Sequence, residues 1–121
     1  MPYVPKLRHL AKIFLRIRDA KAAEGLWFEG LWLSEHGDDE GARQAFLHAC
    51  LLDGQFGGAF YNYAALTEKL QGASPETIKA WNRYLKVAET DRRQARATVE
   101  KVAKHVEELA SGKGSSGGTR R

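Results

Sequence analysis

Histidine and cysteine offer this chain its widest range of chemistry, and the sequence contains few of them. The four histidines and the single cysteine are His9, His36, His48, His105 and Cys50. The histidines have no spacing typical of metal ligands, and Cys50 has no second cysteine as a partner. His48 and Cys50 are close in sequence but point to different sides of a helix, so they form no nucleophile–base pair. The sequence therefore predicts neither a catalytic nor a metal site.

Two short segments look superficially like ligand-binding loops. Asp38-Asp39-Glu40 lacks the alternating ligands and the later glutamate of a calcium loop, and the acidic run suits a helix start instead. Gly57-Gly58 lacks the lysine and hydroxyl residue that follow in a phosphate-binding loop. We expect a protein that is not an enzyme, needs no cofactor and has no small-molecule substrate.

Length and composition indicate one globular domain. The chain has 121 residues, of which 43% are hydrophobic and 28% charged, and this is enough to bury one core. A single cysteine allows no intramolecular disulfide and suits a reducing compartment. No apolar run approaches the ~18 residues of a transmembrane helix, and basic residues interrupt the N-terminal apolar runs, unlike a cleavable signal peptide. We expect a cytoplasmic protein.

The net charge of +4 is unevenly distributed along the chain. Residues 1–18 contain five Lys/Arg and no acidic residue, whereas residues 19–41 contain one Lys and seven Asp/Glu. Residues 92–121 are basic again, with eight Lys/Arg against three Glu. Basic ends on a small helical protein are usually solvated surfaces, but they also suit an anionic partner.

Apolar residues recur at helical spacing along most of the chain, which predicts six helices and no strand. The expected ranges are 5–19, 20–35, 39–52, 58–70, 75–88 and 92–110, and no strong stop separates the first two. Gly37 suits the end of the second helix, Asp38 or Asp39 the start of the third, and Ser74-Pro75 the start of the fifth. Asp91 and Gln94 have the spacing of a capping box before the last helix.

Two helical hairpins in the sequence match each other at a constant offset of 35 residues. The matched pairs are Leu26 with Tyr61, Gly30 with Ala65, Gly37 with Gly72, Ala42 with Thr77, Phe46 with Trp81 and Ala49 with Tyr84. A fixed period of this size is typical of stacked helical repeats. The first unit resembles a tetratricopeptide repeat (TPR) through Leu26, Gly30, Leu33, Ala42, Phe46 and Ala49. The second unit departs from the family pattern at Thr77, Tyr84 and Glu68.

The resemblance implies a TPR-like, right-handed α-solenoid of antiparallel helical hairpins in one domain, residues 1–110. We expect an N-terminal helix at 5–22, repeats at 23–56 and 57–90, a capping helix at 91–110 and a disordered tail at 111–121. The N-terminal helix would cover the first hairpin and the capping helix the second. Gly30 would let the second helix of its hairpin approach closely near Ala42 and Ala45.

The resemblance also implies a concave groove lined by the first helices of successive hairpins, which would bind a protein or peptide. The candidate groove residues are Trp27, Leu31, Asn62, Tyr63, Leu66, Lys69, Arg93 and Arg96. The polar members, Asn62 together with the three cations, suit a peptide carboxylate or acidic side chains. The competing interpretation is that these residues form a solvated face and that Trp27 and Tyr63 belong to the core.

Other binding modes remain open from the sequence. Trp27, Phe28 and Trp32 cannot all face one core, so an exposed aromatic residue would mark a partner surface or a homodimer. As an alternative function, the basic, amphipathic N-terminal helix and the tail would associate with an anionic membrane surface or a nucleic acid. No nucleic-acid-reading motif is recognisable, and the basic residues of that helix fall on several faces, so both partners are disfavoured.

Overall fold

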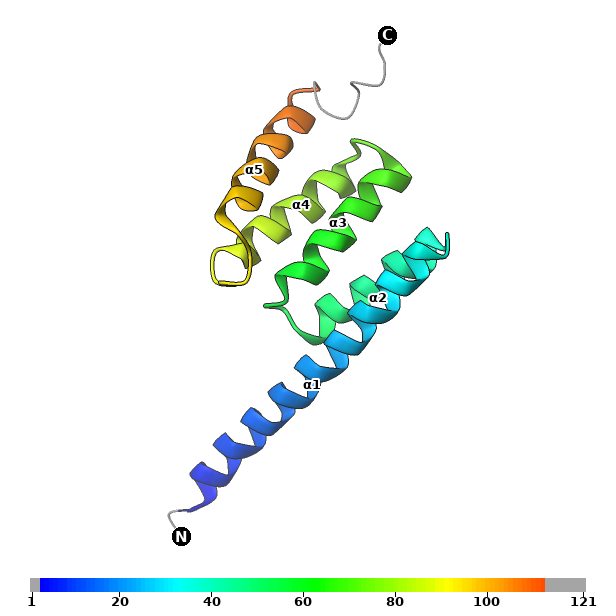
Figure 1. Ribbon diagram of the computed structural model, residues 1–121. Coiled ribbons are helices and arrows are strands. Elements are labelled where there is room, and N and C mark those ends of the chain that lie inside the picture. The colour runs from blue at the N-terminus through cyan, green and yellow to red at the C-terminus, as the bar shows by residue number, and fades with distance from the viewer. Residues whose placement is uncertain (1–2, 113–121) are drawn as a thin grey trace.

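The chain is all-α within residues 3–112, the part that the computed structural model describes, with side chains from His9 onward. The helices are α1 (Tyr3–Glu35), α2 (Asp39–Leu52), α3 (Gly57–Gln71), α4 (Pro75–Ala88) and α5 (Arg96–Ala110) (Figure 1). These described residues contain no strand, as predicted. Most of the segment expected to be a disordered tail, residues 113–121, lies outside the described residues.

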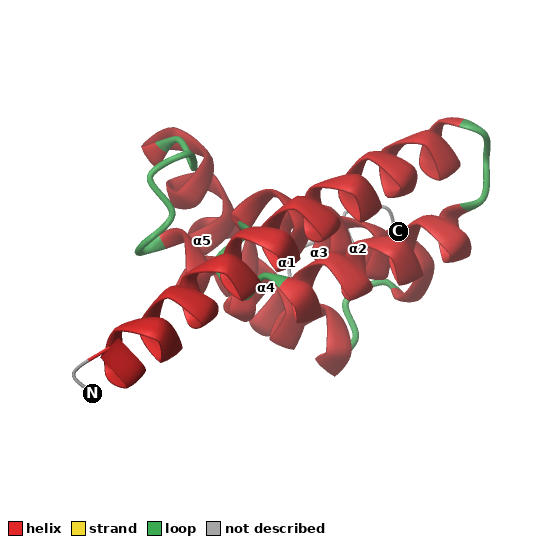
Figure 2. Ribbon diagram, turned by 90° about the horizontal axis from the view of Figure 1, so that it is seen from below, coloured by secondary structure: helices red, strands yellow, loops and turns green. Residues whose placement is uncertain are grey.

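The first two predicted helices form one continuous helix, α1. It has 33 residues, which corresponds to a length of about 50 Å. No proline or left-handed glycine interrupts it near Asp19, so nothing ends the backbone hydrogen-bond ladder there. Every side chain from His9 to Arg18 is exposed, and the N-terminal part of α1 extends beyond the other helices in both Figure 1 and Figure 2. The expectation that this segment covers the first hairpin is therefore wrong.

A tight turn reverses the chain between α1 and α2. Gly37 has φ of 86°, and its N–H donates to the Ser34 carbonyl at 3.2 Å. The N–H of Asp38 donates to the Leu33 carbonyl at 2.9 Å, which completes a glycine-dependent helix end. The Asp38 side chain then accepts a hydrogen bond from the N–H of Gly41 at 2.9 Å and caps α2. These bonds make α1 and α2 an antiparallel hairpin.

Gly30 permits the close contact inside this hairpin, but against a different residue from the one expected. A Cβ atom at Gly30 would lie 2.6 Å from Cε1 of Phe46, well inside van der Waals contact. Phe46 is only 1% exposed, so its ring has no free space into which to move. The side chain that requires a glycine is thus the Phe46 ring, rather than Ala42 or Ala45.

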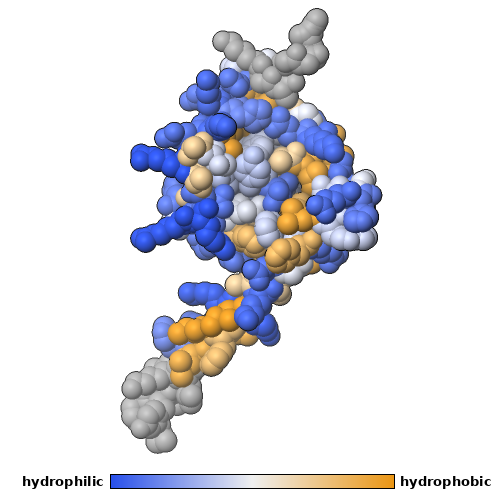
Figure 3. All heavy atoms as spheres, viewed as in Figure 1, coloured by the Kyte–Doolittle hydropathy of each residue, from blue (hydrophilic) through white to orange (hydrophobic). Residues whose placement is uncertain are grey.

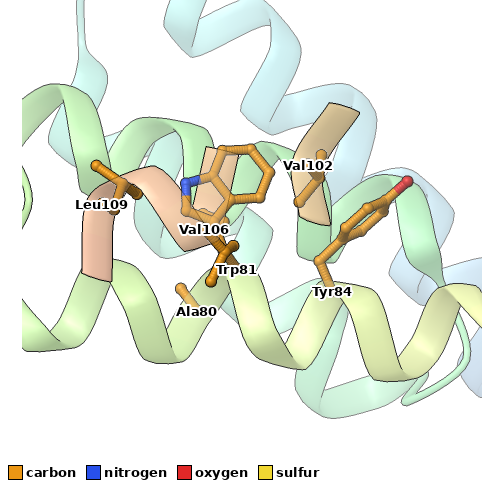
Figure 4. Packing of buried hydrophobic residues seen from close by; sticks show 7 residues of the cluster. Ala80, Trp81, Tyr84, Val102, Val106 and Leu109 are labelled. Carbon is orange, nitrogen blue, oxygen red and sulfur yellow. The ribbon is translucent and has the colours of Figure 1, made fainter. Parts of the chain in front are cut away.

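The last helix covers the second hairpin, as predicted. Val102, Val106 and Leu109 of α5 are buried against Trp81 and Tyr84 of α4 (Figure 4). Helix α4 starts where the sequence indicates, because the Ser74 hydroxyl accepts a hydrogen bond from the N–H of Thr77 at 3.1 Å. This α4–α5 layer completes the core on the C-terminal side.

The start of α5 differs from the prediction. The helix begins at Arg96 instead of Arg92, and its N-cap, Ala95, makes no side-chain capping bond. The predicted capping box is absent: the Asp91 carboxylate binds the N–H groups of Gly57 and Arg93, and the Gln94 side chain accepts from the Tyr84 hydroxyl. Bonds between Asp91 and Gly57, 34 residues apart, and between Tyr84 and Gln94, ten residues apart, replace the pairing of Asp91 with Gln94 that the spacing indicated.

Residues related by the 35-residue offset touch each other in the structure. The indole Nε1 of Trp27 donates to Oδ1 of Asn62 at 2.7 Å, and the Thr90 hydroxyl donates to Oε1 of Gln55 at 2.6 Å. Both pairs are 35 residues apart. Equivalent positions of the two hairpins therefore lie side by side.

Candidate interaction surfaces

The structure joins α1 and α3 through the predicted groove residues Trp27 and Asn62. Their hydrogen bond links the two helices directly, and both side chains are partly buried. Leu66 is 8% exposed and packs with Phe46, with Leu31 against the same cluster. Leu66 thus contributes mainly to the core, whereas Leu31 is partly accessible at the edge of the face.

Tyr63 lies on a different side of α3 from Asn62. Its hydroxyl accepts a hydrogen bond from Nη1 of Arg43 in α2 at 3.3 Å, and the Arg43 guanidinium lies 5.6 Å from the ring centroid. Tyr63 also lines a hollow of about 200 Å³ together with Glu76 and Arg83 of α4. The polar neighbours of Tyr63 therefore come from α2 and α4, the second helices of the two hairpins.

Each predicted cation of the groove already faces a carboxylate. The pairs are Lys69–Asp39 at 2.8 Å, Arg93–Asp91 at 2.8 Å and Arg96–Glu100 at 3.5 Å. Lys69 and Arg93 do not converge on one point: Arg93 lies near the start of α3, and Lys69 is twelve residues along that helix from Gly57, about 18 Å away. The structure does not gather these cations into one carboxylate pocket.

The Asp91–Arg93 pair joins two loops of the fold. Oδ2 of Asp91 accepts a hydrogen bond from the N–H of Gly57 at 2.8 Å, and Nη2 of Arg93 donates to the Gln55 carbonyl at 3.4 Å. Burial alone would raise the pKa of Asp91, but hydrogen bonds from Arg93 and from Gly57 outweigh it and lower the pKa. A Cβ atom at Gly57 would lie 2.7 Å from Oδ2 of Asp91, so the contact requires glycine.

A hollow of about 310 Å³ opens where α1 leaves the rest of the protein. Its lining residues are Ile17, Ala20, Lys21, Glu24, Asp53, Phe56 and Arg93. The Arg93 guanidinium lies over the Phe56 ring at 5.3 Å. Of the predicted groove residues, only Arg93 takes part in this hollow.

Sequence reasoning missed two surfaces. The first is the exposed apolar side of α1, whose pattern was visible but was assigned to packing on the first hairpin. The second is a hollow of about 620 Å³ on α4 between Pro75, Ile78, Lys79, Asn82, Arg83 and Lys86. The spacing of its basic residues, at 79, 83 and 86, places them on one helical face and was the available signal.

The potentially reactive side chains Cys50, Glu68 and His105 are buried or engaged in hydrogen bonds within the fold. Cys50 is buried, and burial raises the pKa of its thiol to about 12, so the thiolate is scarce at neutral pH. Glu68 accepts a hydrogen bond from the Trp81 indole at 2.8 Å and lies 2.7 Å from Nε2 of His105. Among the described residues, no group of three or more His, Cys, Asp or Glu side chains is placed to hold a metal ion.

Comparisons of the chain with protein-family models, curated proteins and solved structures found no match. Within residues 3–112, no helix combines the length and the apolar character needed to cross a membrane.

Proposed function

We propose that the chain is a non-enzymatic protein-interaction module, a short TPR-like α-solenoid of two helical hairpins and a capping helix. The observation that best supports this proposal is the direct contact of Trp27 with Asn62, 35 residues apart. Contacts at the repeat offset are expected where successive hairpins stack in the same orientation. In such stacks the first helices, here α1 and α3, form a continuous face that binds other proteins.

The proposed ligand is an extended protein or peptide segment along α1 and α3. The 18 Å from the start of α3 to Lys69 matches about six residues of extended chain. Leu31 offers partly accessible apolar surface, while Lys69 and Arg96 offer charge. Their side chains are 65% and 92% exposed. The Arg96–Glu100 pair is exposed on both sides and contributes little free energy, so an acidic ligand can replace Glu100. Asp39 is only 20% exposed, so Lys69 would bind an acidic ligand through its exposed ammonium while it keeps Asp39 as a partner.

Arg93 is less suited to this role than the sequence suggested. Its guanidinium donates to both carboxylate oxygens of the buried Asp91. Breaking that pair would leave a buried carboxylate without its strongest partner, which is costly. The binding test is therefore designed around Lys69 and Arg96.

The test is capture of binding proteins from a lysate of the encoding organism, followed by affinity measurement with the purified partner. A Lys69→Glu/Arg96→Glu chain should bind the partner at least about tenfold more weakly, because two favourable contacts become repulsive. The charge-matched control, Lys79→Glu/Lys86→Glu, alters α4 instead and should bind as the wild type does. Equal loss in both variants, or no loss in the groove variant, would refute the groove.

A further inference from the structure

One side of α1 carries a row of large apolar side chains that the other described helices leave uncovered. We define the α1 stripe as Leu10, Phe14, Ile17, Phe28 and Trp32, whose side chains are between 48% and 69% exposed. Steps of three or four residues, and one step of eleven, place them on the same side of the helix. Figure 3 shows hydrophobic side chains gathered along the projecting part of α1 with hydrophilic ones beside them.

Two charged residues occupy the middle of the α1 stripe. Lys21 and Glu24 fill the helical turns between Ile17 and Phe28, and both are exposed. Within the described part of the chain, neither residue takes part in a salt bridge. The pKa of the Arg93 guanidinium is raised mainly by Asp91 and, to a smaller extent, by the nearby Glu24. An apolar row with exposed opposite charges outside any salt bridge at its centre suits a partner that supplies the complementary charges.

The two halves of α1 carry opposite charge. Lys12, Arg16 and Arg18 lie in the N-terminal half, and residues 3–18 contain no acidic residue. Glu24, Glu29 and Glu35 lie in the C-terminal half, beside Phe28 and Trp32, and continue into the acidic start of α2. A second helix of the same kind would complement this one only in the antiparallel orientation.

We propose that the α1 stripe binds the α1 stripe of a second copy of this chain, in an antiparallel pair centred between Lys21 and Glu24. Residues whose numbers add up to 45 then face each other across the two-fold axis. Lys21 meets Glu24 of the other copy, and Ile17 meets Phe28. Phe14 lies over the segment at 31–32, and the two-fold axis repeats every contact. This register covers the stripe and places each basic half on an acidic half.

The fold leaves room for this partner. Helix α1 packs on α2 through a different side, where Gly30 contacts Phe46 and Ala23 is fully buried. The α1 stripe lies away from that side, and the residues from His9 to Arg18 are exposed on all faces of the helix. Near its middle, Ile17, Lys21 and Glu24 border the hollow that they line together with Phe56 and Arg93. Self-association of this kind does not use Lys69 or Arg96, although it brings Phe14 of the other copy beside Leu31 at the edge of the proposed groove.

An anionic membrane fits the same surface less well than a second copy does. The basic half alone would suit lipid headgroups. Phe28 and Trp32, however, share their half of the helix with Glu24, Glu29 and Glu35, which anionic lipids repel. A second copy uses both halves.

The test is sedimentation of the full chain over a concentration series, with charge variants at the centre of the stripe. The wild type should shift with concentration from 13.5 kDa to twice that mass. Lys21→Glu and Glu24→Lys alone should each weaken dimerisation roughly tenfold, since each creates two like-charge contacts per dimer. The double variant Lys21→Glu/Glu24→Lys should restore dimerisation. Circular dichroism checks that each variant remains equally helical.

A second pair of variants tests the apolar contacts. Phe14→Gln/Phe28→Gln replaces two exposed side chains, so the fold should persist while the dimer is lost. The control Leu51→Gln removes a side chain that is 74% exposed on α2, outside the stripe, and should leave the dimer intact.

Three results would overturn the proposal. The first is a wild-type chain that stays monomeric throughout the concentration series. This holds also if the monomer floats with vesicles that contain phosphatidylserine, because the α1 stripe would then bind a membrane and not a second copy. A dimer unaffected by the single charge variants would indicate a parallel pair or another interface. A double variant no better than the singles would exclude the antiparallel register.

Discussion

Asp91 is the residue that holds the α2–α3 and α4–α5 loops together. We expect Asp91→Asn to lower the free energy of unfolding by about 1–3 kcal/mol at neutral pH, because it weakens charge-assisted hydrogen bonds to a buried group. Denaturant unfolding measures this loss. Glu107→Gln, an exposed change on α5, should leave the stability unchanged; an equal effect of both substitutions would contradict the structural role of Asp91.

Asp91 also makes the free energy of unfolding depend on pH, and its contribution decreases as the pH falls. The pKa of Asp91 is lower in the folded chain than its ordinary value of 3.8, so its stabilising contribution is complete above that value. This contribution is lost as the pH falls below 3.8 towards the folded-state pKa. The stability difference between wild type and Asp91→Asn should therefore shrink on acidification, and a difference that grows would contradict the assignment.

A hydrogen bond with Trp81 explains why Glu68 departs from the repeat pattern. The tetratricopeptide pattern that the sequence resembles has an apolar residue at this position, whereas here the carboxylate accepts a hydrogen bond from the Trp81 N–H. Glu68→Leu should lower the free energy of unfolding by about 1–3 kcal/mol, because it leaves a largely buried indole N–H without an acceptor. Glu68→Gln retains an acceptor oxygen and should lose less. If the leucine variant proved as stable as the glutamine variant, the hydrogen bond would not be the reason for Glu68.

At the scale of the element, two glycines of α1 provide a matched comparison. Alanine is favoured over glycine in a helix by about 1 kcal/mol, so Gly25→Ala, where no atom lies within 4 Å of the new Cβ, should stabilise the chain. Gly30→Ala places its Cβ atom against the confined Phe46 ring. Overpacking of about 1–3 kcal/mol should outweigh the gain in helix propensity, so this variant should be less stable than the wild type. Thermal unfolding at one protein concentration compares them. A stabilised Gly30→Ala would show that the contact is not close.

Local signals predicted the elements well. Gly37, Asp38 and Ser74-Pro75 set helix boundaries through bonds to residues a few positions away, and the structure confirms these boundaries. Asp91 failed as a cap because its partner, Gly57, lies 34 residues away, and no local pattern reports such a contact. The continuity of α1 followed from the absence of a stop signal between its two predicted parts.

The candidate surfaces were less predictable, for a related reason. An amphipathic pattern shows that one side of a helix is apolar, but not what covers it, so Leu10, Phe14 and Ile17 were wrongly assigned to contact with the first hairpin. The 35-residue offset was read from other pairs, such as Leu26 with Tyr61. It also relates Trp27 to Asn62, which the structure brings into contact, as expected for equivalent positions of stacked units. Ion pairs such as Lys69–Asp39 depend on tertiary placement and were not visible.

At the scale of the whole molecule, we propose two neighbouring but distinct surfaces: the α1–α3 face for a different protein and the α1 stripe for a second copy. Helix α3 distinguishes them, because it belongs only to the first. Changes at Lys69 and Arg96 should therefore leave the sedimentation behaviour of the chain unchanged. Loss of the dimer in that groove variant would mean that the two surfaces are not separate.

Hydrogen exchange of the chain with and without its purified partner is the most direct test of the proposed binding face. Side chains in contact with a bound partner suppress local opening of the helix that carries them. The backbone amides of that helix then exchange more slowly. We predict increased protection in α3 around residues 62–70 together with the 27–35 segment of α1. Protection confined to α4, or unchanged exchange in α3, would contradict a partner-binding face formed by the first helices of the hairpins.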